Sequence, residues 1–377
     1  MTPTETWEPD ERDAIRQALQ SWFGQTRRSL PWRDKRTPYR TWISEIMLQQ
    51  TQVEAVRPFF ERFMTRFPTL QDLADAPEAD VLQQWAGLGY YSRARNLHRA
   101  ARVVVDQHGG DLPPSVEELI HLPGIGRYTA GAIASLAYNL PAPILDGNVM
   151  RALARLLALR GDPRSGKTNA ALWAAAEELA VGPDPGVLNE AVMELGALVC
   201  LPRTPRCSQC PVSPWCRARR EGIETELPER RPDPRPETRS HAALVARQGD
   251  RVLLQHRVSS TIWRGLFAFP TDFPHPSPLI EHNEKDGARR TAIALAQALG
   301  LPDDLYPIGT IRHGVMNWRI TLHAFGVTPD DATAASLTDR DGLRWVPLEE
   351  LARYGMPSPH RRIARTLSNK DERDERR

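Results

Sequence analysis

Apolar residues recur at helical spacing along roughly the first 220 residues of the chain. Between Asp10 and about Ala218 they return every three or four positions, which gathers them on one face of an α-helix. Short turns that contain Gly or Pro separate these stretches, and no repeat of about 20 to 50 residues is present. The predicted helical segments are Trp42–Phe63, Asp80–Trp85, Ala94–Val105, Val116–Ile120, Thr129–Ala137, Val149–Leu159 and Asn169–Leu179.

The pattern changes after residue 222, where the chain becomes rich in proline and charge. The segment Leu227–Pro236 holds four prolines among charged residues, which favours a stiff, extended linker. The strands predicted beyond it are Ala242–Ala246, Arg251–His256, Trp318–Gly326 and Leu343–Val346, with a helix at Ala288–Leu299. We therefore expect a mostly α-helical domain over residues 10–221, a linker over 222–238, a smaller α+β domain over 239–366 and a charged tail over 367–377.

The charge of the 377-residue chain is nearly balanced, but its arginines are clustered. The formal net charge is +2, and hydrophobic residues make up 41% of the chain, enough to build folded cores. Local positive patches suit a phosphate backbone, although solvated helix faces carry arginine runs about as often. The clusters are Arg93, Arg95 and Arg99, and then Arg203, Arg206, Arg217, Arg219 and Arg220. Met1–Glu11 lacks a signal-peptide pattern and no run approaches ~18 apolar residues, so we expect a cytoplasmic protein with no membrane partner.

All four cysteines fall in one short segment, residues 200–216, with the spacing Cys200-x6-Cys207-x2-Cys210-x5-Cys216. In a reducing compartment such clustering favours metal ligation over disulfides, and thiolates suit both zinc and iron–sulfur clusters. Structural zinc usually takes two close pairs of ligands, whereas only Cys207 and Cys210 form such a pair here. The spacing favours an iron–sulfur cluster and leaves zinc as the alternative.

A glycine-rich turn, Leu122–Thr129, lies between two predicted helices. Gly124 and Gly126 leave bare amide groups in the turn and at the start of the next helix, where the helix dipole favours an anion. These glycines and Arg127 are candidates for holding a DNA phosphate. An ordinary connection between two helices accounts for the Gly-x-Gly pattern about as well.

Two carboxylic residues, Glu45 and Asp146, lie at positions that favour different protonation states. Glu45 is flanked by apolar residues, which favours its protonated form, whereas Asp146 lies just before a predicted helix whose N-terminus would keep it ionised. An acid paired with an anion is the arrangement that hydrolyses glycosidic bonds. For each residue alone, a surface position or a plain helix cap is the commoner explanation.

Five motifs together resemble the MutY adenine DNA glycosylases. They are Leu30-Pro31-Trp32-Arg33, Trp42-x-Ser44-Glu45-Ile46-Met47-Leu48-Gln49-Gln50-Thr51-Gln52, Gly87-Leu88-Gly89-Tyr90-Tyr91, Leu122–Thr129 and Asp146-Gly147-Asn148-Val149. The cysteine spacing matches as well, and the resemblance covers residues 10–220. It implies a helix-hairpin-helix glycosylase fold of two helical lobes that clamp DNA, a 4Fe-4S cluster on the four cysteines, and a target base flipped into the cleft. It further implies a bacterial, nucleoid-associated monomer that acts on double-stranded DNA carrying an adenine mispair; nothing in the sequence identifies protein partners.

The resemblance also assigns roles to individual residues. It implies that Glu45 protonates N7 of the flipped adenine and that Asp146 stabilises the oxocarbenium-like sugar. Related glycosylases that also cut the strand carry a lysine where this chain has Tyr128, so base removal by water is expected. By the same resemblance Tyr128 and Asn148 orient the catalytic groups, Arg33 and Glu190 belong to the adenine pocket, and Gln50, Thr51, Leu88 and Tyr90 form the wedge that touches the opposite base, 8-oxoguanine.

The region of about 239–366 resembles the Nudix-like lesion-reading domain of the family, most clearly at Trp263–Pro270. The segment Asn283–Gly300 lacks the glutamate cluster with which Nudix hydrolases bind magnesium, which makes pyrophosphatase activity the weakest hypothesis. The family's lesion-sensing loop reads Phe-Ser-His, whereas the aligned residues are Val315, Met316 and Asn317. Three hypotheses stay open: excision of adenine opposite 8-oxoguanine or guanine, the same scaffold retuned to another opposite base or lesion, and a DNA-binding protein without catalysis.

Overall fold

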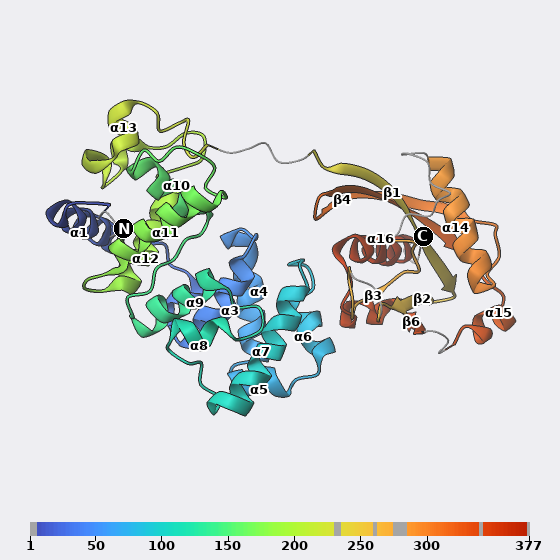
Figure 1. Ribbon diagram of the computed structural model, residues 1–377. Helices are drawn as coiled ribbons and strands as arrows, with labels where there is room; N and C mark the ends of the chain where they lie inside the picture. The colour runs from blue at the N-terminus through green and yellow to red at the C-terminus, as the bar shows by residue number, and fades with distance from the viewer. Residues whose placement is uncertain (1–5, 230–234, 259–261, 274–284, 339–341, 375–377) are drawn as a thin grey trace. The chain divides into compact units, whose positions relative to one another are not determined.

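The structure is a computed structural model of the whole chain. It describes all residues except 1–5, 230–234, 259–261, 274–284, 339–341 and 375–377 (Figure 1). The contacts divide the chain into two compact units. The first unit contains residues 1–75 and 96–232, and the second contains 76–95 and 233–377. The second unit therefore takes a short helical segment, 76–95, from the N-terminal half of the sequence. No helix among the described residues is long and apolar enough to cross a membrane.

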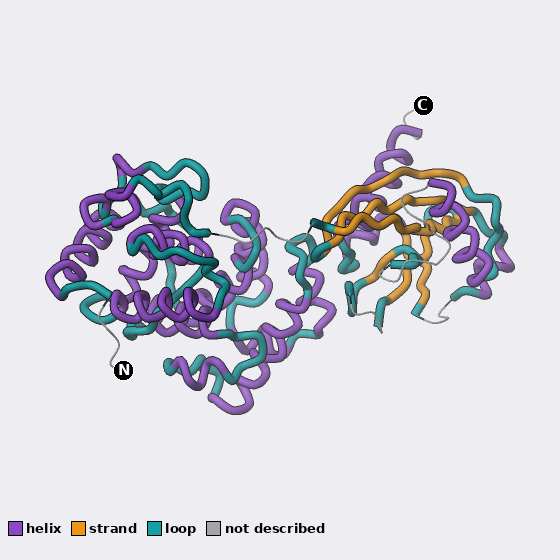
Figure 2. The backbone as a smooth tube through the Cα atoms, turned by 45° about the horizontal axis from the view of Figure 1, so that its top comes forward, coloured by secondary structure: helices purple, strands orange, loops and turns teal. Residues whose placement is uncertain are grey.

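The first unit is α-helical, as predicted, and the strands lie in the second unit (Figure 2). The helices of the N-terminal half are α1 Pro9–Thr26, α2 Pro31–Asp34, α3 Pro38–Leu48, α4 Val53–Arg66, α5 Leu70–Asp75, α6 Glu78–Trp85, α7 Ser92–His108, α8 Val116–Ile120, α9 Arg127–Ala132 with a π-helical turn Ile133–Ala137, α10 Gly147–Leu156, α11 Gly166–Ala180, α12 Pro185–Leu198 and α13 Arg217–Glu221. The prediction of a single helix over Trp42–Phe63 is wrong. This segment forms two helices, α3 and α4, because Gln50 between them adopts a positive φ of 57°, which an α-helix does not tolerate.

One hydrophobic core of the first unit is built from α1, α10, α11 and α12. Leu19, Leu153, Leu172 and Leu188 are buried in it. Three of the four cysteines are partly buried against the same core. Because α10 belongs to this core, its N-terminal end at Asp146 and its C-terminal end near the cysteines are fixed relative to each other.

The glycine-rich turn connects α8 to α9. Gly124 has a φ of +78°, and a Cβ atom there would lie 2.6 Å from Cβ of Asn96 on α7. Both its conformation and the space around it therefore require glycine. Gly126 is the N-cap of α9 and supplies no side-chain cap.

The second unit contains a six-stranded mixed sheet in the order β3-β2-β1-β5-β4, with β6 also paired to β2. The strands are β1 Glu237–Gln248, β2 Arg251–His256, β3 Phe267–Ala268, β4 Tyr306–Val315, β5 Trp318–Val327 and β6 Leu343–Pro347; the helices are α14 Lys285–Leu299, α15 Asp331–Ser336 and α16 Ser358–Asp374. Among the strands that the structure describes, only β1 and β5 pair in parallel. Alternate residues of β1 face opposite sides, so Leu244 packs with α14 and Val245 packs with Ile363 of α16.

The predicted strands and the helix of this half are confirmed, with several differences. The short strand β3 and the helices α15 and α16 lie outside the predicted elements. Strand β4 was not predicted, because its side chains are mostly exposed and show no apolar alternation. Strand β1 begins at Glu237, two residues before the expected start of the second domain at residue 239. Helix α16 continues to Asp374, through most of the segment expected to be a frayed charged tail.

Candidate active site and cysteine site

A cavity of about 540 Å³ opens in the first unit and gathers most of the predicted catalytic and substrate-binding residues. Sequence reasoning alone could not bring these residues together, because they come from separate helices. The predicted residues that line the cavity are Arg33, Glu45, Gln50, Thr51, Tyr128, Asp146, Asn148 and Glu190. The cavity is therefore large enough for a nucleobase and carries both carboxylates of the predicted pair.

Glu45 lies in α3 with only 4% of its surface exposed. The Tyr128 hydroxyl donates a hydrogen bond of 2.6 Å to Oε2 of Glu45. Burial raises the pKa of Glu45 to about 7; the negative charge of Asp146 adds to this shift, and the hydrogen bond from Tyr128 opposes it. The prediction that an apolar wall favours the protonated form of Glu45 agrees with this shift. Near neutral pH this carboxyl group can donate a proton.

Asp146 is the N-cap of α10 and also lines the cavity, so the two interpretations of this residue do not exclude each other. Its Oδ1 accepts hydrogen bonds from the backbone amides of Asn148 at 2.9 Å and Val149 at 2.7 Å. Its Oδ2 accepts one from Nδ2 of Asn148 at 3.2 Å. Burial raises the pKa of Asp146, whereas these hydrogen bonds at the helix N-terminus lower it and favour the ionised form, as predicted for this position.

Asn148 is held in place by Arg151, which lies one turn further along α10. The Arg151 guanidinium donates to Oδ1 of Asn148 at 2.9 Å, to the Gly196 carbonyl at 2.7 Å and to the Cys200 carbonyl at 2.7 Å. Helix α12 approaches closely here, since a Cβ atom on Gly196 would lie 2.6 Å from Cβ of Asn148. The side chain that binds Asp146 is therefore fixed from two sides.

The wall around Glu190 is a network of ion pairs. Arg33 Nε lies 2.8 Å from Oε1 of Glu190, and Arg36 Nη2 lies 2.7 Å from Oε2. Arg28 and Arg33 also bind Glu194, at 2.8 Å and 3.2 Å, and these hydrogen bonds hold the pKa of Glu194 at about 2. Sequence reasoning named Arg33 and Glu190 but missed Arg28, Arg36 and Glu194, because arginine and glutamate are common surface residues and nothing in their spacing marks them.

The remaining predicted residues do not line this cavity. Leu88 and Tyr90 belong to the second unit, where Leu88 is buried and Tyr90 is half exposed. Gly124 and Gly126 lie in the turn before α9, and Arg127 is the first residue of α9. Arg127 pairs with Glu177, and its guanidinium lies 3.8 Å from the ring centroid of Trp173.

Within the second unit, Tyr90, Val315 and Met316 line another cavity, of about 270 Å³. Tyr90 has a φ of 48° and Met316 a φ of 52°, and Met316 is 76% exposed. Strained, exposed side chains of this kind are typical of contact surfaces. Asn317 does not line the cavity, and its carbonyl accepts a hydrogen bond from the Glu237 amide at 3.0 Å.

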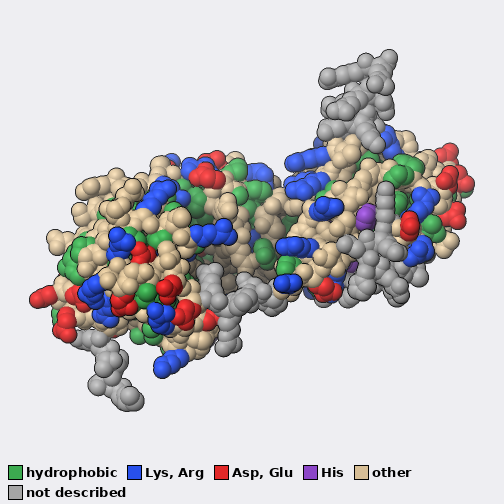
Figure 3. Space-filling view, turned by 90° about the horizontal axis from the view of Figure 1, so that it is seen from above, with side chains coloured by type: hydrophobic (Ala, Val, Ile, Leu, Met, Phe, Trp, Pro, Cys, Tyr) green, Lys and Arg blue, Asp and Glu red, His purple; other side chains and the backbone are tan. Residues whose placement is uncertain are grey.

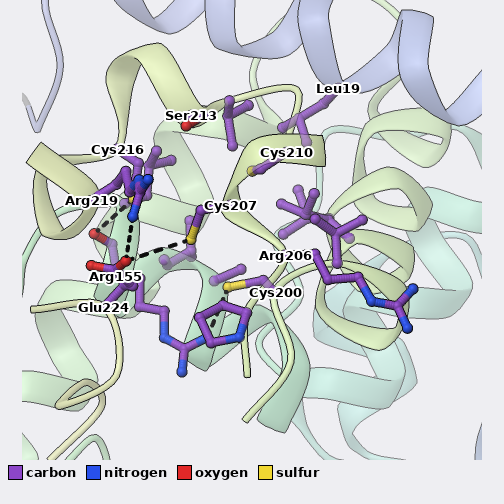
Figure 4. A pocket seen from close by; sticks show the side chains of 18 of the residues that line it. Leu19, Arg155, Cys200, Arg206, Cys207, Cys210, Ser213, Cys216, Arg219 and Glu224 are labelled. Atoms are coloured by element: carbon purple, nitrogen blue, oxygen red, sulfur yellow. Dashed lines mark hydrogen bonds and ion pairs between the residues drawn. The ribbon is translucent and has the colours of Figure 1, made fainter. Parts of the chain in front are cut away.

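The four cysteines line one small apolar cavity of about 40 Å³ (Figure 4). Cys200 follows α12, Cys207 and Cys210 lie at the two ends of one short 3-10 turn, and Cys216 precedes α13. Burial raises the pKa of Cys210 to about 12. Arg155, almost fully buried, donates to Sγ of Cys200 at 3.3 Å. Among the described residues no three His, Cys, Asp or Glu side chains lie close enough together to hold a single metal ion. Four sulfur donors around one apolar space suit an iron–sulfur cluster, which is wider than one ion.

Comparisons with known proteins agree with this fold and site. Residues 43–178 match the HhH-GPD superfamily of base excision DNA repair proteins, and residues 241–366 match the NUDIX domain. The chain is 34% identical to the adenine DNA glycosylase of Homo sapiens, over 94% of this chain and 74% of the human protein. It is 37% identical to that of Buchnera aphidicola subsp. Baizongia pistaciae, over 67% of this chain and 72% of that protein. The solved structure of a thermostable thymine-DNA glycosylase superposes with a TM-score of 0.51 at 28% identity, over 56% of this chain and 98% of that one.

A helical unit with a glycine-rich hairpin, and a carboxylate cavity beside it, define a base excision DNA glycosylase of the helix-hairpin-helix class. Within this class, the sequence identity to an adenine DNA glycosylase extends over 94% of the chain, and the NUDIX match lies in the second unit. The chain belongs to the MutY family of adenine DNA glycosylases.

Proposed function

We propose that this enzyme hydrolyses the N-glycosidic bond of adenine in a DNA mispair, with Glu45 as the proton donor and Asp146 as the stabilising anion. The observation that carries this proposal is that Glu45, Tyr128, Asp146 and Asn148 line the same cavity. The reaction needs a protonated acid and an anion. Glu45, with a pKa of about 7, would be the acid, and the hydrogen-bonded carboxylate of Asp146 would be the anion.

The proposed reaction proceeds in two stages within this cavity. Glu45 gives its proton to N7 of the flipped adenine, so the base leaves with the bonding electron pair and without negative charge. The C1′ cation of the sugar is stabilised by Asp146 until water adds to it, and the proton of that water returns to the Glu45 carboxylate. Tyr128 cannot form a Schiff base as a lysine would, so the strand is left uncut.

Replacing Glu45 by Gln tests this assignment. The amide keeps the size of the side chain but has no acidic proton. We expect single-turnover release of adenine to fall by at least about 100-fold while the affinity for mispaired duplex stays within about twofold. Excision by the Glu45→Gln variant at the rate of the unmodified enzyme would remove Glu45 from this role.

We further propose that the opposite base is read by the second unit, with 8-oxoguanine as the preferred partner of adenine. Tyr90, Val315 and Met316 share one cavity, and Tyr90 is exposed enough to stack on a base. Arg and Lys side chains gather on one side of this unit in Figure 3, and a positive surface of this kind suits phosphates.

The alternative is that Val315, Met316 and Asn317 retune the enzyme to another opposite base, because the loop lacks a serine hydroxyl and an imidazole. Single-turnover rates on duplexes with adenine opposite 8-oxoguanine, guanine, cytosine or an abasic site separate the two. A preference of about tenfold or more for 8-oxoguanine, a difference of about 1.4 kcal/mol, supports the first proposal. Equal rates opposite 8-oxoguanine and guanine favour the alternative.

Cys200, Cys207, Cys210 and Cys216 would hold a 4Fe-4S cluster, which would tie the chain after α12 into one module. Protein purified without oxygen should be brown and contain about four iron and four sulfide per chain. A colourless, zinc-loaded protein would overturn this proposal. The turn at Gly124 and Gly126 would bind a DNA phosphate through its backbone amides, next to the N-terminus of α9.

A further inference from the structure

Arg36 is an arginine that neither motif nor spacing singles out, yet its guanidinium lines the active-site cavity. It lies in the short loop between α2 and α3. Its Nη2 is 2.7 Å from Oε2 of Glu190, and its Nη1 donates to the Leu136 carbonyl at 3.2 Å. The side chain is thus fixed at both ends of its guanidinium group.

The charges around Glu190 show why Arg36 matters. Arg33 binds Oε1 of Glu190, but it also donates to Glu194 at 3.2 Å and to the Arg28 carbonyl at 2.9 Å. The charge of Arg33 is therefore shared between two carboxylates, and Arg36 is the cation that balances Glu190. Only 7% of the surface of Glu190 is exposed, so water compensates little of its charge.

The geometry also fixes what Glu190 presents to a base. Each of its oxygens pairs with one arginine, which holds the carboxylate in one orientation. An ionised carboxylate only accepts hydrogen bonds. Such a carboxylate can accept a hydrogen bond from the exocyclic amino group of adenine. The O6 carbonyl of guanine is itself an acceptor, so guanine in the same position would leave both acceptors without a donor.

We propose that Arg36 is a positioning residue for base specificity: it holds Glu190 as an ionised, oriented acceptor for the amino group of the flipped adenine. This inference depends on the proposed function, since it assumes that the cavity receives adenine. The same guanidinium acts on the proton donor, because its positive charge lowers the pKa of Glu45, while Glu190 and Asp146 raise it.

The charged and titratable groups that line the cavity together with Glu45 come from several elements. They are Arg28, Arg33 and Arg36 around α2, Tyr128 on α9, Asp146 at the start of α10, and Glu190 and Glu194 on α12. Removing Arg36 leaves two acidic neighbours of Glu45, Asp146 and Glu190, with one fewer cation. The pH at which excision falls on the alkaline side should then rise.

The experiment compares the unmodified enzyme with Arg36→Gln, Arg36→Lys and a control, Arg164→Gln, in the full chain. Arg164 is exposed, pairs with Asp162 and does not line the cavity. Single-turnover rates are measured on mispairs that contain either adenine or purine, which lacks the 6-amino group, across a range of pH. The ratio of the adenine rate to the purine rate reports contact with the amino group.

For Arg36→Gln we expect this ratio to fall by about 10- to 100-fold, the range for loss of one hydrogen bond to a charged group. The alkaline limb of the adenine profile should move to higher pH, and Arg164→Gln should change neither quantity. If Arg36→Gln does not fold, Arg36→Lys decides, since it keeps the charge but loses the two-pronged geometry and should lower the ratio without moving the limb. An unchanged ratio in a folded Arg36 variant overturns the role of Arg36 alone, whereas an unmodified enzyme that releases no adenine from any duplex overturns the proposed function instead.

Discussion

The hydrogen bond between Tyr128 and Glu45 gives the sharpest prediction for the chemistry of the site. At 2.6 Å, the Tyr128 hydroxyl donates to the carboxylate of Glu45 and so stabilises its ionised form. Burial raises the pKa of Glu45 to about 7, and this bond opposes that rise. The change Tyr128→Phe removes the donor and leaves the ring that fills the space.

The size of the effect follows from the character of this bond. A hydrogen bond to a charged group contributes about 1.5–3 kcal/mol, and one pH unit corresponds to about 1.4 kcal/mol. Because Glu45 is buried, solvent screens the bond little, so its loss should raise the pKa of Glu45 by about one to two units. A general acid works in its protonated form, so excision falls as pH rises through this pKa. In Tyr128→Phe the alkaline limb should therefore lie about one to two pH units higher.

Single-turnover excision between about pH 5 and pH 10, with saturating enzyme, measures the position of this limb. Tyr138→Phe is the matched control, because Tyr138 donates to the Leu112 carbonyl and does not line the cavity. An alkaline limb that stays in place in Tyr128→Phe, or that moves equally in Tyr138→Phe, would refute the view that Tyr128 sets the acidity of Glu45.

Three further predictions concern stability and assembly. Burial lowers the pKa of His360 to about 3, so at this residue the unfolded chain binds more protons than the folded chain below about pH 6.5. The contribution of His360 to stability should therefore fall by about 2 kcal/mol from pH 7.5 to pH 5, measured by urea unfolding as the difference in pH dependence between the unmodified chain and His360→Gln. The added Cβ in Gly196→Ala would overlap Asn148, so this change should lower the free energy of unfolding by about 1–3 kcal/mol and remove most of the excision rate. A fully active variant would contradict the close packing of α12 against α10. Cys210→Ser should lower the iron content and the melting temperature together, and an unchanged iron content would remove Cys210 from the ligand set.

Much of the fold follows from local patterns in the sequence. Apolar periodicity located most helices of the first unit and the inner strands of the second, because burial imposes that periodicity. It failed where burial does not act. Strand β4 is mostly exposed, and the break between α3 and α4 depends on the backbone of Gln50 and not on a change of polarity.

The site was predicted by motif and not by periodicity. Glu45 and Asp146 were chosen from their neighbours and from a family resemblance, and only the tertiary structure places both on one cavity. The effect of the helix N-terminus on Asp146 is local and could be predicted, whereas the burial that raises the pKa of Asp146 depends on the whole fold. The pair of Arg36 and Glu190 joins residues more than 150 positions apart, a contact that one sequence does not reveal.

The assignment of residues 76–95 to the second unit likewise lay beyond sequence reasoning. Tyr91 donates to the Met356 carbonyl at 3.2 Å, and Arg361 donates to the Ala86 carbonyl at 3.1 Å. These bonds use backbone acceptors, which carry no sequence signal.

A double-mutant cycle tests most directly whether the carboxyl groups of Glu45 and Asp146 act on one glycosidic bond. Single-turnover adenine release is measured for Glu45→Gln, Asp146→Asn and the double variant on one mispaired duplex, each with DNA binding verified. If both groups stabilise the same transition state, each single change should remove most of the rate, and the double variant should lose far less than the product of the two losses. Losses that simply multiply, or one single variant that releases adenine at the unmodified rate, would contradict the account.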